Sequence, residues 1–191
     1  MPRPITLFTG QWADLPFEEV CRKAAAWGYD GLEIACWGDH MDVRKAASNQ
    51  GYVREKKRLL KRHNLKCLAL GAHLAGQCVG DQYDSRLEAY APAEVKGKPE
   101  ALRKWAVKEM KATALAARNM GCYVVTGFMG SPIWKAWYSF PPTREEMVEE
   151  GFHKIRDLWT PILDEFDKQN VKFALEVHPT EIAFDIYTAA R

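Results

Sequence analysis

The sequence lacks any apolar run long enough to cross a bilayer, which excludes a membrane-spanning helix of ordinary length. Hydrophobic residues make up 47% of the 191 residues, but they lie in short segments. The N-terminal Met1-Pro2-Arg3-Pro4 is not followed by the hydrophobic region of a signal peptide, so we expect a cytoplasmic protein. The formal net charge is only +2, which gives no reason to expect binding to nucleic acid or to an anionic membrane.

Two motif classes are also missing. The five cysteines, at positions 21, 36, 67, 78 and 122, are odd in number and form no C-x-x-C pair. This pattern is typical of reduced thiols in the core of a cytosolic protein. No G-x-G-x-x-G or G-x-x-x-x-G-K motif follows an apolar segment, so a nucleotide-binding open sheet is disfavoured.

Short apolar segments alternate with amphipathic ones five times along the chain. We expect strands near residues 5–8, 31–35, 65–70, 123–125 and 171–178, and helices near 16–27, 49–63, 99–120 and 143–169, with a last helix beginning after 182. The first four of these helices are followed by Gly28, Asn64, Gly121 and Asn170, residue types that commonly end helices. The alternation predicts an α/β fold with parallel strands joined by right-handed crossovers.

Three loop features follow from the same pattern. The segment from 74 to 98 reads as a long loop, and loops of that length in a compact domain are usually functional. The loop from 126 to 142 carries several aromatic residues and is a candidate substrate lid. Pro161 is expected to kink or interrupt the fourth helix, because proline lacks the backbone N–H.

The last expected strand ends in chemically useful side chains. Phe173, Ala174, Leu175 and Val177 form a nearly continuous apolar run, which predicts a strand covered on both faces. Glu176 and His178 are two residues apart, so on a strand they would point to the same side. The functional interpretation is an active site at the carboxyl end of a parallel strand. The alternative is a hydrogen-bonded pair that only holds the sheet edge.

Polar residues follow several different strands. Glu33, His73, Glu176 and His178 all lie at expected strand ends. A barrel would collect them around one axis, whereas an open sheet would scatter them. The pattern therefore favours a (β/α)8 barrel over an open doubly wound sheet.

Three stretches resemble a known family. They are Gly28-Tyr29-Asp30-Gly31-Leu32-Glu33-Ile34, Leu70-Gly71-Ala72-His73-Leu74 and Ala174-Leu175-Glu176-Val177-His178-Pro179-Thr180-Glu181. Together they are similar to the sugar phosphate isomerase/epimerase family, the xylose-isomerase-like TIM barrels, and within it to the branch with C-glycoside deglycosidase catalytic subunits. The resemblance extends along the whole chain, and the Leu-Glu-Val-His-Pro stretch is its most specific part.

The resemblance implies a (β/α)8 barrel of which this chain carries about the first five β/α units, as a single domain over 1–191. It also implies a divalent metal held by Glu, Asp, His and Glu; manganese is expected first, with magnesium, cobalt or zinc as alternatives. Glu176 matches the first ligand, and the others lie on strands six to eight in the family. The chain therefore reads as truncated at its C-terminus and as inactive alone.

The implied activity is isomerisation, epimerisation or elimination by proton abstraction next to a carbonyl of a sugar or keto-glycoside. Glu176 and His178 are the catalytic candidates. His73, Glu33, Trp37 and Trp134 are substrate-binding candidates, although Glu33 and His73 also fit structural roles. A homo-oligomer, or a hetero-oligomer with a small subunit, is expected. A non-catalytic barrel subunit is the main alternative, and an abasic-site endonuclease is disfavoured because no basic groove is evident.

Overall fold

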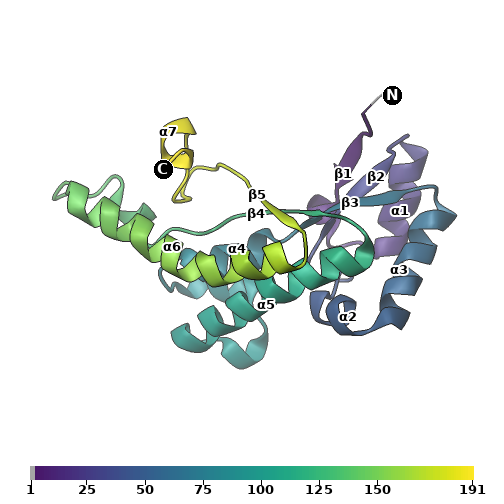
Figure 1. Cartoon of the computed structure of the whole chain (residues 1–191), viewed down its shortest axis with the longest axis horizontal. Coiled ribbons are helices and arrows are strands. Elements are labelled where there is room, and N and C mark those ends of the chain that lie inside the picture. The colour runs from purple at the N-terminus through teal and green to yellow at the C-terminus, as the bar shows by residue number, and fades with distance from the viewer. Residues whose placement is uncertain (1–2) are drawn as a thin grey trace. The chain divides into compact units, whose positions relative to one another are not determined.

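A computed structural model describes residues 3–191, so Met1 and Pro2 of the N-terminal stretch lie outside it (Figure 1). The strands are β1 (Thr6–Phe8), β2 (Gly31–Ala35), β3 (Lys66–Gly71), β4 (Val124–Gly127) and β5 (Lys172–Leu175). The helices are α1 (Phe17–Ala26), α2 (Val43–Ser48), α3 (Gln50–Arg62), α4 (His73–Gly80), α5 (Pro99–Met120), α6 (Glu145–Lys168) and α7 (Ile186–Ala189). Short 3-10 helices are η1 (Thr9–Trp12), η2 (Ser85–Tyr90), η3 (Ala93–Val95) and η4 (Trp134–Ala136). The chain forms two compact units.

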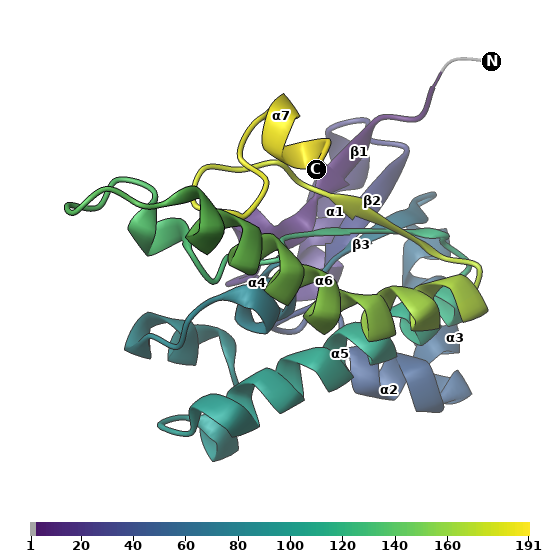
Figure 2. The same ribbon diagram turned by 60° about the vertical axis from the view of Figure 1, so that its left-hand side comes forward.

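The first unit comprises residues up to 72, 111–126 and 166–174, and it is built on the sheet. The strands are ordered β1-β2-β3-β4-β5, and the register between the first four is parallel. Lys172 N donates to Tyr123 O at 2.9 Å, which links β5 to β4. Figure 2 shows β1, β2 and β3 side by side, with α1 and α3 beside them. The parallel α/β fold predicted from the alternation is therefore confirmed.

The helix ends also follow the prediction. Gly28 and Gly121 have φ angles of +84° and +78°, the left-handed conformation that costs glycine little. Asn64 and Asn170 adopt the same region, with φ of 56° and 54°. Each of these residues stops a helix and turns the chain toward the next strand. The four residues predicted to end helices therefore do end them.

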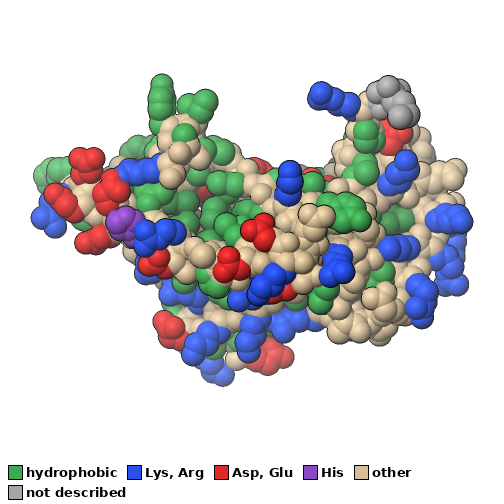
Figure 3. Space-filling model, viewed as in Figure 1, with side chains coloured by type: hydrophobic (Ala, Val, Ile, Leu, Met, Phe, Trp, Pro, Cys, Tyr) green, Lys and Arg blue, Asp and Glu red, His purple; other side chains and the backbone are tan. Residues whose placement is uncertain are grey.

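The second unit comprises residues 73–110, 127–165 and 175–191. Its core includes Trp159 and Ile162 on α6, both nearly fully buried. Trp159 also donates its indole N–H to the carbonyl of Met129 at 3.0 Å, so a bulky core residue fixes the chain that follows β4. Apolar side chains project from α7, visible at the top of Figure 3, where Ile186 and Tyr187 are 77% and 81% exposed.

One predicted loop is wrong in part, and Pro161 does not interrupt its helix. Residues 73–80 form helix α4, not the start of a long loop. Its glycines allow close packing: a Cβ added at Gly76 would lie 2.0 Å from the carbonyl oxygen of Phe128. Pro161 lies inside α6, which is assigned as one helix from Glu145 to Lys168. A proline removes one hydrogen bond, and the packing of residues such as Ile162 keeps the remaining turns helical.

The last strand is shorter and less buried than predicted. β5 ends at Leu175, so Glu176 and His178 lie beyond it, and strand alternation does not govern where they point. Its residues are exposed or half-buried, and Val177 is 45% exposed. The reason is that β5 is the last strand in the sheet order, with no further strand beside it among residues 3–191. The apolar run in the sequence correctly predicted a strand, but it did not show how many strands lie beside it.

Candidate active site

The second unit brings together two residues that the sequence separates by 103 positions. His73 Nε2 lies 2.9 Å from Glu176 Oε2. His73 is the first residue of α4, directly after β3, while Glu176 follows β5 and donates its backbone N–H to Gly127 O at 3.0 Å. The His73 side chain is only 8% exposed, whereas that of Glu176 is 50% exposed. A buried imidazole thus holds a carboxylate that remains accessible to a ligand.

Phe128 lies between the two histidines of this region. Its ring centroid is 4.8 Å from that of His73, in an edge-on arrangement, and 5.1 Å from that of His178. The contact restricts both imidazoles, because aromatic pairs at this spacing attract one another. Phe128 was predicted only as a member of the aromatic loop, and its position between the histidines could not be read from the sequence.

His178 belongs to a turn, not to a strand. Its backbone N–H donates to Ala183 O at 3.2 Å, and its Nδ1 lies 2.6 Å from Pro179 O. A carbonyl accepts only, so this contact places the proton on Nδ1 and leaves Nε2 as an acceptor in the neutral ring. His178 was predicted to share a strand face with Glu176, but it is held by its own turn. Glu176 instead contacts His73.

Sequence reasoning missed Glu181, which organises this turn. Its side chain is buried, and Oε2 accepts hydrogen bonds from the backbone N–H groups of Met129 and Gly130 at 3.1 and 2.6 Å. Burial raises the pKa of Glu181 to about 7, while these hydrogen bonds act in the opposite direction. The carboxylate ties the turn carrying His178 to the segment after β4. The one available signal was an acidic residue directly before the apolar pair Ile182-Ala183.

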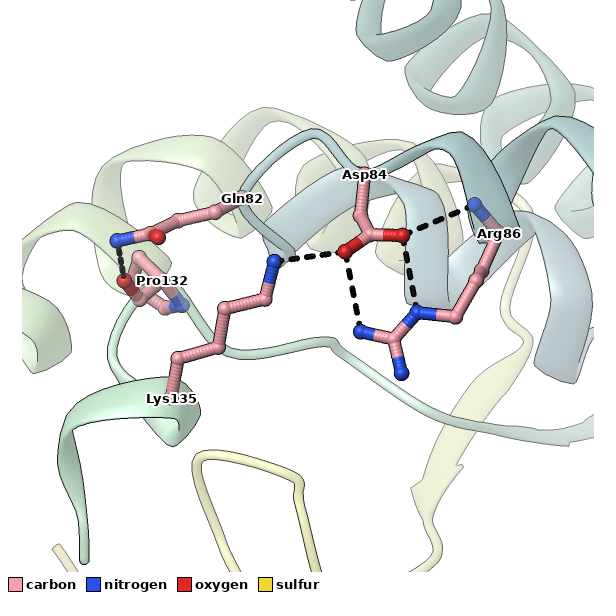
Figure 4. Close-up of polar contacts among 5 residues, drawn as sticks. All are labelled: Gln82, Asp84, Arg86, Pro132 and Lys135. Atoms are coloured by element: carbon pink, nitrogen blue, oxygen red, sulfur yellow. Dashed lines mark hydrogen bonds and ion pairs between the residues drawn. The ribbon is translucent and has the colours of Figure 1, made fainter. Parts of the chain in front are cut away.

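A pocket of about 300 Å³ in the same unit has both charged and aromatic side chains in its lining, and His178 is one of the lining residues. The other lining residues come from α4, η2, η4 and the segment 81–84, together with Phe128 and Thr180. Trp134, a predicted substrate-binding residue, is one of its walls and also lines a second pocket of about 360 Å³. Asp84, Arg86 and Lys135 also line the first pocket. Figure 4 shows the contacts among these three side chains.

The other two predicted binding residues belong to the first unit. The Thr126 hydroxyl donates to Glu33 Oε1 at 2.6 Å, and this bond joins the end of β4 to β2. Trp37 meets the ring of Phe8 edge-on, with centroids 5.9 Å apart. Glu33 therefore has a structural contact of the kind expected for a residue that holds a strand end. A sugar-binding role for either residue stays a prediction.

The fit of these residues to a metal ion is incomplete. Among residues 3–191, no three His, Cys, Asp or Glu side chains form a group that could hold a metal ion. Glu176 and His73 offer two donor atoms, and structural metal sites commonly use four. The described residues therefore do not supply a full coordination shell, and a ligand role for Glu176 stays a prediction.

Among residues 3–191, none of the helices has the length and apolar character needed to traverse a bilayer.

Comparison with solved structures places this arrangement among known folds. A 3-keto-D-glucoside 4-epimerase, YcjR from E. coli, aligns with a TM-score of 0.67 at 14% identity, covering 100% of this chain and 63% of its own. A D-psicose 3-epimerase from Clostridium cellulolyticum H10, solved with D-tagatose, gives 0.56 at 14% identity, covering 92% and 52%. A magnesium complex of a xylose isomerase-like TIM barrel protein from Mycobacterium smegmatis gives 0.57 at 13% identity, covering 98% and 59%.

The chain thus spans about three fifths of the first of these structures and somewhat less of the others. This agrees with the prediction that it carries about five β/α units of an eight-unit barrel. A search of curated proteins found no match. The model of one family, described as xylose isomerase-like TIM barrel, matches residues 21–191. The chain belongs to the xylose isomerase-like TIM barrel family.

Proposed function

We propose that this protein is a sugar isomerase or epimerase that moves a proton next to a carbonyl carbon. The observation that carries the proposal is the contact between Glu176 and His73. A half-exposed carboxylate held by a buried imidazole is suited to general-base work, because its orientation is fixed and its second oxygen can meet a substrate. The sugar epimerases among the similar solved structures support the same substrate class.

In the proposed reaction, a Glu176 oxygen takes the proton from the carbon beside the keto group of a sugar. The electron pair of that C–H bond becomes the C=C bond of an enediol or enediolate, and the carbonyl oxygen takes up the charge. Return of a proton to the former carbonyl carbon, together with transfer of the hydroxyl proton to the former carbonyl oxygen, completes an isomerisation. Delivery of a proton from solvent to the other face of the original carbon restores the carbonyl and completes an epimerisation. His73 acts through Glu176 by holding its position.

His178 is proposed as the residue that binds the substrate beside this centre. It lines the pocket of about 300 Å³ together with Phe128 and Trp134. Its acceptor Nε2 can receive a hydrogen bond from a sugar hydroxyl, and the aromatic rings can cover the apolar face of a sugar ring. A role as the base of an elimination reaction remains the alternative for this residue.

A divalent metal, with manganese first, is part of the proposal, with Glu176 as one ligand. Such an ion would supply positive charge that stabilises the negative charge developing on the carbonyl oxygen. The magnesium complex among the similar structures supports a divalent ion in this family. Metal analysis of the purified protein after dialysis is the direct measurement, and a metal content that falls in Glu176→Gln would support the ligand role independently of activity.

The test of the reaction class is solvent exchange. A chain extended through the remaining strands of the barrel is incubated in D2O with a keto-hexose or a 3-keto-glucoside, because the 191 residues alone are expected to be inactive. NMR follows deuterium entering the carbon beside the carbonyl. We expect exchange with at least one sugar and none with Glu176→Gln. Glu150→Gln, which changes an exposed glutamate on α6, is the matched control. Absence of exchange with every keto sugar contradicts the proposal, and an unsaturated product would indicate elimination instead.

A further inference from the structure

Two cysteine thiols of the first unit lie next to each other at the edge between β3 and β4. The two strands are parallel, and their register pairs Leu70 with Val125. Cys67 stands three positions before Leu70, and Cys122 stands three positions before Val125, so the register brings the cysteines opposite each other. Although β3 has an irregularity beside Cys67, the two side chains do interact, through a hydrogen bond between the thiols. We call these two residues the thiol pair.

The spacing of the thiol pair is suited to a disulfide. Both cysteines are free thiols in the structure. Neighbouring strands of a sheet lie about 4.8 Å apart, and a disulfide joins Cα atoms that are about 4.4–6.8 Å apart. The two residues could therefore be joined without a large movement of the backbone. Cys36 is not placed in this way, because it follows β2 and its backbone N–H donates to Gly71 O, at the other end of β3, at 2.9 Å.

A pocket of about 420 Å³ between α3 and the C-terminal end of α5 gives access to one of the two thiols. Its lining includes Cys67 and three lysines, namely Lys57, Lys61 and Lys66. Cys67 is half-buried, whereas Cys122 is only 3% exposed and is absent from the lining. A reagent that enters this pocket therefore meets Cys67 first, with Cys122 behind it.

The charge of this pocket is of one sign. All three lysines are exposed, and the lining residues, which come from the described residues 3–191, include no Asp or Glu. A Cβ built at Gly121 would lie 3.7 Å from Lys57 Nζ, so this ammonium group lies beside the residue that precedes Cys122. The pocket next to the thiol pair therefore attracts anions and repels cations.

The electrostatic surroundings set this pair apart from the buried cysteines elsewhere. The hydrogen bond between the thiols raises the pKa of Cys67 and lowers that of Cys122, while burial acts to raise both pKa values. The charge of Lys57 acts to lower the pKa of both thiols. The pair can therefore carry one thiolate, the form of cysteine that attacks a disulfide. Cys21 and Cys78 have no such partner, and burial raises the pKa of each to about 12.

We propose that the thiol pair is a redox modification site, which an anionic low-molecular-weight disulfide bound in this pocket oxidises to a Cys67–Cys122 disulfide. The thiolate of Cys67 attacks one sulfur of the reagent, whose S–S bond breaks and releases one half as a thiolate. The thiolate of Cys122 then attacks the sulfur of Cys67 and releases the second half. Two protein thiols are thus oxidised to one disulfide, the reagent is reduced to two thiols, and the two thiol protons pass to the released thiolates. The inference does not depend on the proposed function.

The experiment treats the reduced 191-residue protein with small disulfides of different charge. They are oxidised glutathione, which is anionic, hydroxyethyl disulfide, which is neutral, and cystamine, which is cationic. Peptide mapping by mass spectrometry after reaction with oxidised glutathione should find the Cys67 peptide joined to the Cys122 peptide, and dithiothreitol should separate them.

The rate of modification at Cys67 tests the charge of the pocket. Each rate is divided by the rate of the same reagent with the protein unfolded in urea, which removes differences in the intrinsic reactivity of the reagents. We expect the normalised rate to be about tenfold higher for oxidised glutathione than for cystamine, a modest effect for electrostatic steering. The difference should shrink as ionic strength rises.

Variants separate the roles of the residues. Cys122→Ser should stop the reaction at a mixed disulfide on Cys67, and Cys67→Ser should leave Cys122 unmodified. Cys36→Ser, which removes another half-buried thiol, is the control and should react like the wild type. Lys61→Gln should slow the reaction with oxidised glutathione about threefold and leave that with hydroxyethyl disulfide unchanged. Its control is Lys104→Gln, which changes an exposed lysine of α5 outside the pocket lining.

The proposal is overturned if Cys67 is not oxidised, if it bonds to a cysteine other than Cys122, or if the wild type stops at the mixed disulfide. It is equally overturned if the normalised rates do not depend on the charge of the reagent, or if Lys61→Gln reacts like Lys104→Gln. The peptide mapping and the comparison of reagents use the wild-type protein, so both results stand even where a cysteine variant fails to fold.

Discussion

His73 Nε2 lies 2.9 Å from Glu176 Oε2, although one residue begins α4 and the other follows β5. The parallel topology explains why two distant positions meet, because residues that follow parallel strands emerge at the same edge of a sheet. The pair combines a buried ring with a half-exposed carboxylate. Its geometry leads to separate expectations for each partner.

Glu176→Gln is expected to lower turnover about 10²- to 10⁴-fold, the usual contribution of a general acid or base. Glutamine keeps the shape and can still contact His73, so the fold should be retained. Steady-state kinetics and circular dichroism, compared with Glu150→Gln, check both parts. More than a few per cent of wild-type activity with normal metal content would refute the assignment of Glu176.

His73→Leu is expected to reduce kcat about 10- to 100-fold with little change in KM, because His73 positions Glu176 without touching the substrate. His73→Gln retains a donor on a side chain of similar reach and should recover part of the loss. His153→Leu, which changes an exposed histidine on α6, is the control. Equal losses in the leucine and glutamine variants would show that the hydrogen bond is not what matters.

The buried carboxyl of Glu181 should make stability depend on pH. Its pKa is about 7 in the folded protein, against 4.5 for a glutamate side chain exposed to water. The folded state therefore holds the proton more tightly than the unfolded state does. Stability should therefore fall as pH rises from about 4.5 to 7. One pKa unit is worth about 1.4 kcal/mol, and the loss should be on the order of 3 kcal/mol.

Urea unfolding of the wild type and Glu181→Gln at pH 5 and pH 8 measures this effect. Glutamine cannot ionise but can accept from the N–H groups of Met129 and Gly130, so the variant should lose less stability between the two pH values. Some slope should remain, because burial also raises the pKa of Asp81. An unchanged slope in Glu181→Gln, matching that of Glu150→Gln, would exclude Glu181 as its source.

Gly76→Ala should destabilise the second unit, because the added methyl group would lie 2.0 Å from the carbonyl oxygen of Phe128. Overpacking of this kind typically costs about 1–3 kcal/mol, and here the obstacle is backbone that cannot rotate away. Gly97→Ala separates this effect from backbone strain, since Gly97 has a φ of +70° but nothing within 4 Å of the added atom. Thermal unfolding should show the larger loss for Gly76→Ala, and similar losses would contradict the packing argument.

Helix α4 shows where sequence periodicity stops being informative. Its eight residues include two glycines, and six of the eight are buried, so no amphipathic pattern marks it as a helix. Close approach of the Phe128 and Met129 backbone requires those glycines, and that approach is a tertiary fact. Glu181 was missed for a similar reason, since its partners are backbone N–H groups about 50 positions away.

The sequence by itself determined the five strands, the parallel fold and the helix stops at Gly28, Asn64, Gly121 and Asn170. These features depend on local conformational preference and on apolar periodicity, and both can be recognised from residues that are close together in the sequence. It also pointed to Glu176, His178 and His73 as residues that follow strands.

Only the tertiary structure decided that Glu176 bonds to His73 while His178 is held by its own turn. The same is true of the ion pair between Lys135 and Asp84, which are 51 positions apart. Such pairings depend on the distances between side chains from separate elements. Those distances are set by packing, because they arise only when helices and loops far apart in the chain fill the same space.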